Sequence, residues 1–336
     1  MITNKKILIT GSNGFIGSHL CMRLLSDHNV EIIGVDNNND YYDVSLKEYR
    51  LNKILELNKN FKFIKGDISD HNFINDLFKD NKFDIVINLA AQAGVRYSID
   101  NPDAYMKSNV IGFYNILEAI RHNKPEHFIY ASSSSVYGNN SKVPFSTEDK
   151  VDNPISLYAA TKKSDELFAY TYSHLYDIKT TGLRFFTVYG PAGRPDMAYY
   201  SFTNKIINNE SIKVFNYGKC QRDFTYIDDI VEGIVRIIEK GPKDNYNLYN
   251  IGNNHPENLL DFINCLTNCL KNNGVIDSSY NIDEHIELVP MQAGDVEMTY
   301  ADTTALENDY GFKPNTSLQD GLDKFVKWYK EFIENK

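Results

Sequence analysis

A tyrosine and a lysine stand four residues apart, at Tyr158 and Lys162, and a run of four serines, residues 132–135, precedes them. In a helix this spacing places the two side chains one turn apart on the same face. A tyrosine phenol has a pKa of about 10, so action as a base near neutral pH requires a decrease of about three units, or roughly 4 kcal/mol. A neighbouring ammonium favours the phenolate, and a serine hydroxyl can hold a substrate oxygen. These residues predict a proton-transfer site; hydroxyls that only satisfy one another in the core are the alternative.

A second candidate site is a glycine turn between a strand pattern and a helical pattern near the N-terminus. Gly11 would permit a tight turn, Gly14 would let the backbone approach a pyrophosphate, and Gly17 would let the helix pack on the strand. The helix N-terminus favours phosphate groups. Asp36 ends the next strand, where a carboxylate can accept hydrogen bonds from a ribose, and this favours NAD over NADP. We therefore expect NAD as the cofactor; a flexible glycine loop is the alternative.

Two further strand ends carry residues that could line the same cleft. Asp67 follows the third strand and could bind an adenine amino group, or it could be the N-cap of the next helix. Small residues end the fourth strand and leave space for a ligand at the carboxyl edge of the sheet. The residues expected at the cofactor are Gly11, Asn13, Gly14, Phe15, Ile16, Gly17, Asp36, Asp67, Ile68, Leu89, Ala90, Ala91, Tyr158 and Lys162.

The elements that must position these residues alternate along the chain. Short β-branched runs are separated by longer amphipathic stretches, which is typical of a parallel sheet built from βαβ units. Apolar residues at helical spacing from Val110 to Ile120 predict one helix over the sheet, and another is expected to begin near Leu157. We predict an α/β fold, a Rossmann-type doubly wound parallel sheet with a smaller mixed α/β domain after it. The strands are expected at residues 6–10, 30–35, 61–64, 84–89, 127–131 and 180–185.

The pattern becomes less regular after residue 190, and a chain of 336 residues corresponds to roughly two domains. We expect residues 1–190 to form the NAD-binding domain that carries the tyrosine and the lysine. Residues 191–336 would form the substrate-binding domain, with room for the chain to cross back between the two. Further helices are expected at residues 230–238, 259–270 and 318–332.

Composition excludes several classes of protein. Forty-five acidic residues against 35 basic ones give a net charge of −10, and there is no basic block, which argues against binding to nucleic acid or anionic membranes. There is no apolar run of about 18 residues, and the chain starts directly in a strand pattern rather than in a signal peptide. The four cysteines are scattered and do not form a metal-binding pattern. We expect reduced thiols, no metal and a cytoplasmic protein.

The motifs together resemble a known family. Residues 11–17, 88–91, 132–138 and 158–162 look like those of extended short-chain dehydrogenases/reductases that act on nucleotide sugars. Over nearly the whole length, the closer resemblance is to UDP-glucuronate 4-epimerases. It implies NAD-dependent epimerisation of UDP-glucuronate to UDP-galacturonate through a 4-keto hexuronate, an isomerase reaction. The stretches that carry this closer resemblance are residues 36–42, 91–98, 184–198 and 222–227.

The resemblance also implies roles for individual residues. Ser133 would be the hydroxyl partner of Tyr158, and Lys162 would also anchor the nicotinamide ribose. Ser134 and Ser135 stand where related dehydratases and decarboxylases carry an acid, so epimerisation is the chemistry that remains. With Thr187, they would hold the sugar carboxylate through neutral hydroxyls.

The same resemblance places residues around the rest of the nucleotide sugar. Arg222 would bind the diphosphate, Asp295 the ribose and Val214 the uracil, whereas Arg194 would lie at the uronate or at the diphosphate. The residues expected at the substrate are Arg96, Ser134, Ser135, Thr187, Arg194, Val214, Arg222 and Asp295.

Two other functions and one assembly are compatible with these motifs. A 4-epimerase of UDP-glucose/UDP-galactose or of a UDP-N-acetylhexosaminuronate would share every catalytic group. A non-catalytic nucleotide-sugar sensor is disfavoured, because binding alone needs no tuned phenolate. Relatives form a homodimer through helices that correspond to residues 110–120 and 167–176; the alternative is that these helices only cover their own sheet. The expected dimer contacts are Phe168, Tyr172, Leu175 and Tyr176.

Overall fold

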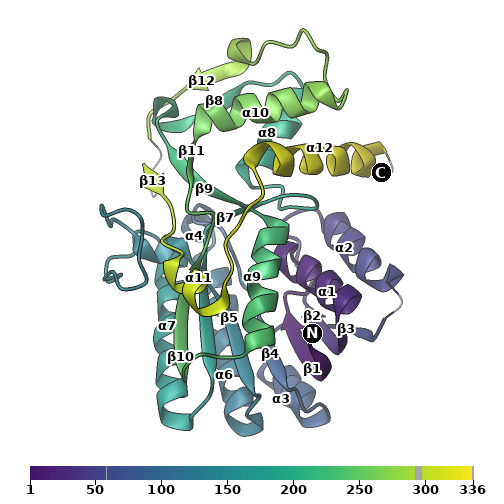
Figure 1. Cartoon of the computed structure of the whole chain (residues 1–336), viewed down its shortest axis with the longest axis vertical. Coiled ribbons are helices and arrows are strands. Elements are labelled where there is room, and N and C mark those ends of the chain that lie inside the picture. Colours follow the sequence, from purple (N-terminus) through teal and green to yellow (C-terminus); the bar gives the residue numbers. More distant parts are fainter. Residues whose placement is uncertain (58, 292–296, 335–336) are drawn as a thin grey trace.

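A computed structural model describes residues 1–57, 59–291 and 297–334 (Figure 1). Within these residues, seven parallel strands form one sheet in the order β10-β6-β5-β4-β1-β2-β3. The six strands expected from the sequence all belong to this sheet, close to their expected bounds. The strands are β1 (Thr3–Thr10), β2 (Asn29–Asp36), β3 (Phe61–Lys65), β4 (Ile85–Asn88), β5 (His127–Ser133), β6 (Thr180–Phe185) and β10 (Tyr246–Ile251).

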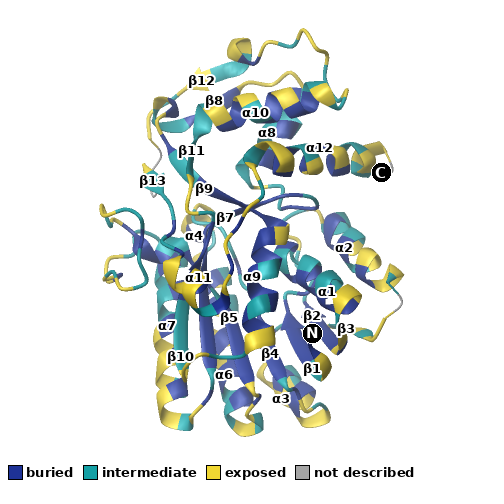
Figure 2. Ribbon diagram, viewed as in Figure 1, coloured by how far each residue is buried: buried dark blue, intermediate teal, exposed yellow. Residues whose placement is uncertain are grey.

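Helices cover both faces of this sheet, and its central strands β4, β5 and β6 are almost entirely buried (Figure 2). Alternate residues of a strand face opposite sides: Ile7 and Ile9 of β1 belong to one hydrophobic core, and Leu8 belongs to the other. This arrangement confirms the predicted Rossmann-type α/β fold. The first face carries α1 (Phe15–Asp27), α2 (Val44–Glu56) and α9 (Ile227–Lys240), and the second carries α3 (His71–Asp80), α6 (Gly112–Asn123) and α7 (Leu157–Tyr176).

The helix expected from Val110 to Ile120 is not one regular α-helix. A short helix α5 (Pro102–Tyr105) continues into a π-helical segment, η1 (Met106–Ile111), before α6 begins. The wider π turn changes the register of the side chains, so Val110 remains partly exposed while Ile120 is buried. Neighbouring short elements are α4 (Tyr97–Asp100) and the 3₁₀ segment η2 (Ser134–Tyr137).

The rest of the chain forms a smaller assembly at one end of the sheet (Figure 1). Its strands pair as β11-β9-β13, with β7 beside β9, and as β12-β8. Its strands are β7 (Thr187–Tyr189), β8 (Ile212–Val214), β9 (Gln221–Tyr226), β11 (Pro256–Asn258), β12 (Ile286–Leu288) and β13 (Met298–Thr299). Its helices are α8 (Ala198–Ile207), the 3₁₀ segment η3 (Phe215–Gly218), α10 (Leu259–Asn272), the 3₁₀ segment η4 (Ile282–His285), α11 (Thr304–Tyr310) and α12 (Leu318–Glu334).

After residue 190 the chain crosses back to the large sheet. β10 pairs with β6 in parallel from Tyr246 to Ile251, and α9 packs on α1, where Arg23 and Glu232 form an ion pair. One hydrophobic core therefore runs from the large sheet into the smaller assembly. None of the helices in the described ranges is long and apolar enough to span a membrane.

Candidate active site

Two adjoining cavities lie where the parallel strands end. The first is lined by Gly11, Asp36, Leu89 and Ala131, at the carboxyl ends of β1, β2, β4 and β5. The second has a volume of about 630 Å³, within the range of small-molecule sites, and lies between the sheet and the smaller assembly. This position is the edge at which open α/β sheets bind ligands. The side chains that line both cavities are Tyr41, Ser133, Tyr158, Phe185, Phe186, Arg194 and Met197.

The glycine loop has little room for side chains. Gly11 has a φ of +71°, and its N–H donates to the carbonyl of Val35 at 2.7 Å. A Cβ atom on Gly11 would lie 2.8 Å from the backbone nitrogen of Ala90, and one on Gly17 would lie 2.1 Å from the carbonyl oxygen of Gly11. Gly14 is the N-cap of α1 and has no side chain to cap it. The loop therefore presents a backbone wall and a helix N-terminus to the first cavity, which suits phosphate groups.

Asp36 is held in place from behind by the glycine loop. Its Oδ2 accepts from the N–H of Asn13 at 3.2 Å, and its Oδ1 accepts from the N–H of Asn38 at 2.8 Å. Asn13 is fully buried and lines neither cavity, so it supports Asp36 instead of facing the cofactor cavity as expected. The sequence places no cation directly after Asp36, but the fold brings Lys47 within 4.0 Å. The Lys47 ammonium is occupied by the carbonyl and side-chain oxygens of Asn39, at 2.9 and 2.8 Å.

The structure separates the two roles considered for Asp67. The N-cap of α3 is Asp70, whose Oδ1 accepts from the N–H of Phe73 at 3.1 Å, so Asp67 is not the cap. Asp67 lines the first cavity and accepts from the N–H of Ser69 at 2.9 Å. Burial alone raises the pKa of Asp67, but the hydrogen bonds from Ser69 and Asn37 outweigh burial and leave the pKa lowered. An ionised carboxylate therefore faces the first cavity. The other expected cofactor residues, Phe15, Ile16, Ile68, Leu89, Ala90 and Ala91, also line it.

Helix α7 carries the tyrosine and the lysine into the site. Ser156 caps the helix by accepting from the N–H of Ala159 at 3.1 Å, which places Tyr158 in the first turn and Lys162 in the second. Tyr158 is partly exposed and lies in the wall between the cavities. Its ring packs edge to face with the ring of Tyr105, and the two ring centroids are 5.9 Å apart. Lys162 is buried behind it and lines only the first cavity. The expected pair is therefore brought together at the junction.

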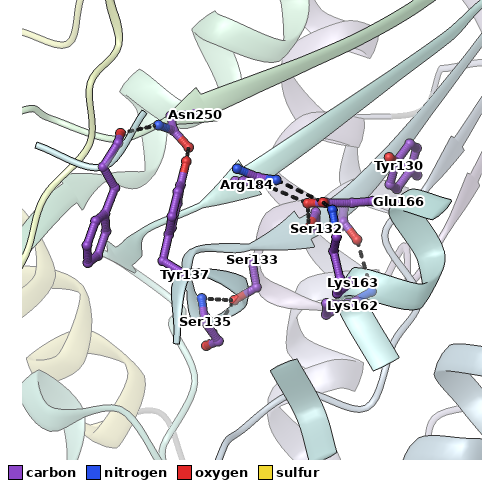
Figure 3. Close-up of polar contacts among 12 residues, drawn as sticks. Tyr130, Ser132, Ser133, Ser135, Tyr137, Lys162, Lys163, Glu166, Arg184 and Asn250 are labelled. Atoms are coloured by element: carbon purple, nitrogen blue, oxygen red, sulfur yellow. Dashed lines mark hydrogen bonds and ion pairs between the residues drawn. The ribbon is translucent and has the colours of Figure 1, made fainter. Parts of the chain in front are cut away.

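The serine run follows the alternation of β5, so that its members have different partners. Ser132 donates to Oε1 of Glu166 at 2.7 Å, inside the protein. Ser133 lines both cavities, and its Oγ accepts from the N–H of Ser135 and donates to the Ser135 hydroxyl, both at 3.2 Å. Figure 3 shows these contacts and the side of the strand on which each hydroxyl lies. Ser132 is therefore bound to Glu166 at the wall of the first cavity, whereas Ser133 lies in the wall shared by both cavities.

A buried ion pair that the sequence analysis did not single out anchors this strand end. Arg184 of β6 donates from Nε and Nη2 to the two carboxylate oxygens of Glu166, at 2.8 and 2.9 Å (Figure 3). Burial alone raises the pKa of Glu166, but the hydrogen bonds and charge of Arg184 leave it lowered, so the carboxylate is ionised. The Arg184 guanidinium also lies 4.8 Å from the centroid of the Tyr137 ring. The only available sequence signal was the position of Glu166, four residues after Lys162 on the same helix.

Most residues expected at the substrate line the second cavity. Val214 does not: it is fully buried, whereas Lys213 and Phe215 on either side line the cavity, as the alternation of a strand dictates. Asp295 lies outside the described residues. Arg96 lies 5.1 Å from the centroid of the Phe215 ring. The expected residues that line the cavity are Arg96, Ser134, Ser135, Thr187, Arg194 and Arg222.

Arg194 lies in the wall between the cavities and is fixed by Asp196. Its Nε and Nη2 donate to the two oxygens of Asp196 at 3.0 and 2.5 Å, and Tyr41 donates to Asp196 at 3.3 Å. Burial alone raises the pKa of Asp196, but the charge of Arg194 keeps it lowered, whereas burial raises the pKa of Tyr41 to about 12. The loop before Arg194 is held by the buried Arg50, which donates to the carbonyl of Ala192 at 2.9 and 2.7 Å. Arg50 escaped the sequence analysis because its backbone partners are distant in the sequence, whereas Asp196 lies in the stretch 184–198 but was not singled out.

Within residues 1–57, 59–291 and 297–334, no group of three or more His, Cys, Asp or Glu side chains could hold a metal ion. The residues at the junction of the two ligand cavities provide a phenol, an ammonium and hydroxyls. The phenol can exchange a proton with a molecule in the second cavity while the first holds a cofactor.

Comparisons with known proteins give the family. The model described as GDP-mannose 4,6 dehydratase matches residues 8–325. Protein CapI of Staphylococcus aureus is 50% identical over 345 residues, which cover 98% of this chain and 99% of CapI. UDP-glucuronate 4-epimerase 4 of Arabidopsis thaliana is 44% identical over 342 residues, which cover 97% of this chain and 75% of that protein.

Among solved structures, UDP-glucuronic acid 4-epimerase from Bacillus cereus, in complex with UDP-glucuronic acid and NAD, superposes with a TM-score of 0.86. It is 34% identical in sequence, and the match covers 97% of this chain and 99% of that one. The chain thus belongs to the GDP-mannose 4,6-dehydratase family, within the NAD-dependent epimerases and dehydratases.

Proposed function

We propose that this protein is an isomerase that interconverts UDP-glucuronate and UDP-galacturonate by NAD-dependent epimerisation at C4. The observation that carries the proposal is the position of Tyr158 and Ser133 in the wall shared by the two cavities, with Lys162 behind them in the first. A relative and a solved structure that are both named for this activity cover nearly the whole chain.

The residues of the first cavity fit NAD. The glycine loop leaves no space for a Cβ at Gly11 or Gly17, so the backbone can approach a diphosphate closely. Asp36 lies at the end of β2, where its carboxylate can accept from the adenosine ribose and would repel a 2′-phosphate. Asp67 lines the same cavity, and its carboxylate would suit an adenine amino group. When bound in this cavity, NAD would supply reversible hydride transfer at sugar C4.

The protein residues supply the proton chemistry of this cycle. Tyr158 takes the proton of the C4 hydroxyl as the hydride leaves, which gives a 4-keto sugar, and it returns the proton when the hydride is returned. The Lys162 ammonium stabilises the phenolate, and Ser133 holds the C4 oxygen by a hydrogen bond. Because the proton and the hydride both return to the sugar, the reaction is redox-neutral and needs no second substrate.

The neutral hydroxyls that line the second cavity suit the carboxylate of the sugar. A 4-keto uronate is a β-keto acid that can lose carbon dioxide if its carboxylate rotates freely. Ser134, Ser135 and Thr187 offer three neutral hydroxyls in one part of the cavity, which can bind the carboxylate and restrict rotation about C5–C6. The Arg222 guanidinium, which also lines this cavity, suits two diphosphate oxygens.

The test is incubation of the purified protein with UDP-glucuronate, with and without added NAD, followed by chromatographic separation of the 4-epimer. We expect UDP-galacturonate to appear and the mixture to reach the same ratio from either sugar. UDP-glucose and a UDP-N-acetylhexosaminuronate, incubated in parallel, rank the other 4-epimerase substrates. Binding of UDP-glucuronate without any epimer would contradict the proposal and favour a sensor.

We also infer that the protein is a homodimer through α6 and α7. Apolar side chains remain exposed along α7, at Tyr114 of α6 and at Ile111 at the end of η1, whereas two expected contacts, Tyr172 and Tyr176, bind Glu118 and Arg121 within the chain. Light scattering should give twice the mass of 38.6 kDa, and Leu167→Glu should reduce it to the monomer mass. A monomer at all concentrations would contradict the dimer. The exposed side chains are Ile111, Tyr114, Leu167, Phe168, Tyr170 and Leu175.

We also propose that the two parts of the chain, before and after residue 190, bind different ligands. Residues 1–190 would bind NAD, and residues 191–336 would bind most of the nucleotide, although β10 returns to the large sheet. We place the protein in the cytoplasm, because its thiols are free in spite of the two neighbouring cysteines Cys265 and Cys269. Cell fractionation of the producing organism tests that placement.

A further inference from the structure

Helix α7 carries a second acidic residue next to the catalytic lysine that the proposed reaction does not use. Asp165 is fully buried, and its Oδ2 accepts from the Lys162 ammonium at 3.1 Å. The same ammonium donates to the carbonyl of Ala131 on β5 at 2.9 Å. Oδ1 of Asp165 has no hydrogen-bond partner among the described residues. A buried carboxyl with an unsatisfied oxygen is costly, so its presence in this place needs a reason.

These two contacts use part of the hydrogen-bonding capacity of the Lys162 ammonium. An ammonium has three N–H donors, and two of them are directed to Ala131 and Asp165, away from the shared wall. The remaining donor is available to the first cavity, where Tyr158 lies. Asp165 therefore holds the lysine from behind, and its negative charge competes with the Tyr158 phenolate for the same cation.

The adjacent residue on α7 shows what a purely structural carboxylate looks like here. Glu166 is also buried, but both of its oxygens are bound by Arg184, and Ser132 adds a third bond. Within the described part of the chain, the Asp165 carboxylate has one hydrogen-bond partner, and that partner is the lysine of the site. The difference points to a role in the reaction rather than in the fold.

We propose that Asp165 is a positioning residue that holds Lys162 and sets the pH at which Tyr158 becomes an effective base. The proposal rests on the proposed function, because it assigns Lys162 and Tyr158 the parts given above. With Asp165 neutral, Lys162 can give its full charge to the phenolate. With Asp165 ionised, part of that charge is cancelled and the phenolate is less favoured.

The surroundings of Asp165 make both forms accessible. Burial raises the pKa of Asp165 to about 7, although the nearby Lys162 charge acts in the opposite direction. The Glu166 carboxylate on the same helix adds to the increase, and Tyr130 of β5 also lies close enough to interact with Asp165. The carboxyl therefore changes charge close to neutral pH, where an intracellular epimerase works.

The test compares the pH profiles of kcat/KM for the wild-type protein, Asp165→Asn and Asp165→Ala, with UDP-glucuronate at saturating NAD. Two coupled acids titrate as a pair, so the acidic limb of the wild-type profile reports both groups. In the variants the limb should become a single ionisation and move to lower pH by up to about one unit. The activity on the alkaline side of the limb should stay within a few-fold of wild type.

A control variant separates this effect from the loss of a carboxylate elsewhere in the chain. Asp228 on α9 is exposed, lines neither cavity and lies near Lys324. We expect Asp228→Asn to leave the acidic limb in place. A limb that moves equally in both Asn variants would overturn the proposal.

The pH dependence of Tm reports on Asp165 without any activity. Its pKa is higher in the folded chain than in the unfolded one, so its favourable contribution is complete below pH 4 and is lost as the pH rises through about 7. The Asp165→Asn variant has no such contribution to lose. The Tm of the variant minus the Tm of the wild type should therefore increase from pH 5 to pH 8. If that increase occurs but the acidic limb does not move, Asp165 is structural and the inference is wrong. If the wild-type protein makes no epimer at all, the proposed function fails instead.

Discussion

The two cavities are built from different parts of the chain in different ways. One part of the cofactor cavity is formed by the backbone of the glycine loop, at Gly11, Gly14 and Gly17, and by small residues at the ends of sheet strands, such as Ala90. The substrate cavity instead has long polar side chains from loops and from the smaller assembly, such as Arg222. The first site therefore depends on backbone geometry, and the second depends on side chains that can change without moving the fold. This difference explains how one cofactor site can serve enzymes with different sugars.

The largest loss of activity is expected from a change at the wall that the two cavities share. Tyr158→Phe removes the hydroxyl that takes the C4 proton but leaves the ring against Tyr105. We expect kcat to fall by up to about 10⁴-fold, the range for loss of a general base, while NAD binding stays within a few-fold. Initial rates and calorimetric titration with NAD measure the two effects.

The control is Tyr170→Phe on the same helix. Tyr170 is exposed and contacts only the Tyr246 ring among the ring contacts of the described residues. Its variant should keep wild-type kcat. Full activity of Tyr158→Phe would contradict the assignment of the base and, with it, the role of the junction.

A methyl group in the glycine loop tests whether the first cavity depends on backbone geometry. In Gly17→Ala the new Cβ would lie 2.1 Å from the carbonyl oxygen of Gly11, so α1 must move away from the loop. We expect about a 100-fold loss of NAD affinity and a lower Tm, because the phosphate-binding wall is displaced. Ser26→Ala, at the exposed end of α1, should change neither quantity. Unchanged NAD affinity in Gly17→Ala would show that the loop is not the phosphate site.

Loss of one long side chain tests the second cavity. The Arg222 guanidinium is oriented by the carbonyls of Gln221 and Glu297, at 2.9 and 3.0 Å. Arg222→Ala should raise the KM for UDP-glucuronate about 30-fold, or ~2 kcal/mol, the usual value of hydrogen bonds to a charged group. Its kcat should change little, because the diphosphate is remote from C4. Arg236→Ala on α9, which lines neither cavity, is the control, and equal KM values for the two variants would contradict a diphosphate site.

The cofactor cavity was also the part that could be predicted from the sequence. The β-branched runs and the glycines fix strands, turns and helix starts locally, and parallel strands bring their carboxyl ends together. Gly11, Asp36 and Tyr158 therefore fall where expected without any knowledge of distant contacts. The exceptions have local causes as well: Asn13 turns behind Asp36, and Val110 is displaced by a π-helical turn.

The substrate cavity was predicted less completely, because its geometry depends on contacts between distant residues. Arg50 holds the Ala192 loop across 142 positions in the sequence, and the sequence alone indicates no such pairing. Glu166 and Arg184 are a helix residue and a strand residue whose pairing needs the packed fold. Val214 shows the opposite case: strand alternation, which is readable from the sequence, predicts that its neighbours face the ligand.

The smallest expected effect concerns the hydroxyls of the second cavity. Thr187→Val keeps the shape of the side chain at the start of β7 but removes one hydroxyl that would bind the sugar carboxylate. We expect the KM for UDP-glucuronate to increase about fivefold, or ~1 kcal/mol, with the KM for UDP-glucose unchanged, because UDP-glucose lacks the carboxylate. A UDP-pentose side product would show that the freed carboxylate is lost as carbon dioxide from the 4-keto intermediate. Thr171→Val, exposed on α7, is the matched control. If Thr187→Val changed the KM of both sugars equally, the hydroxyl would not recognise the carboxylate, and the selectivity of the second cavity would have to come from its other side chains.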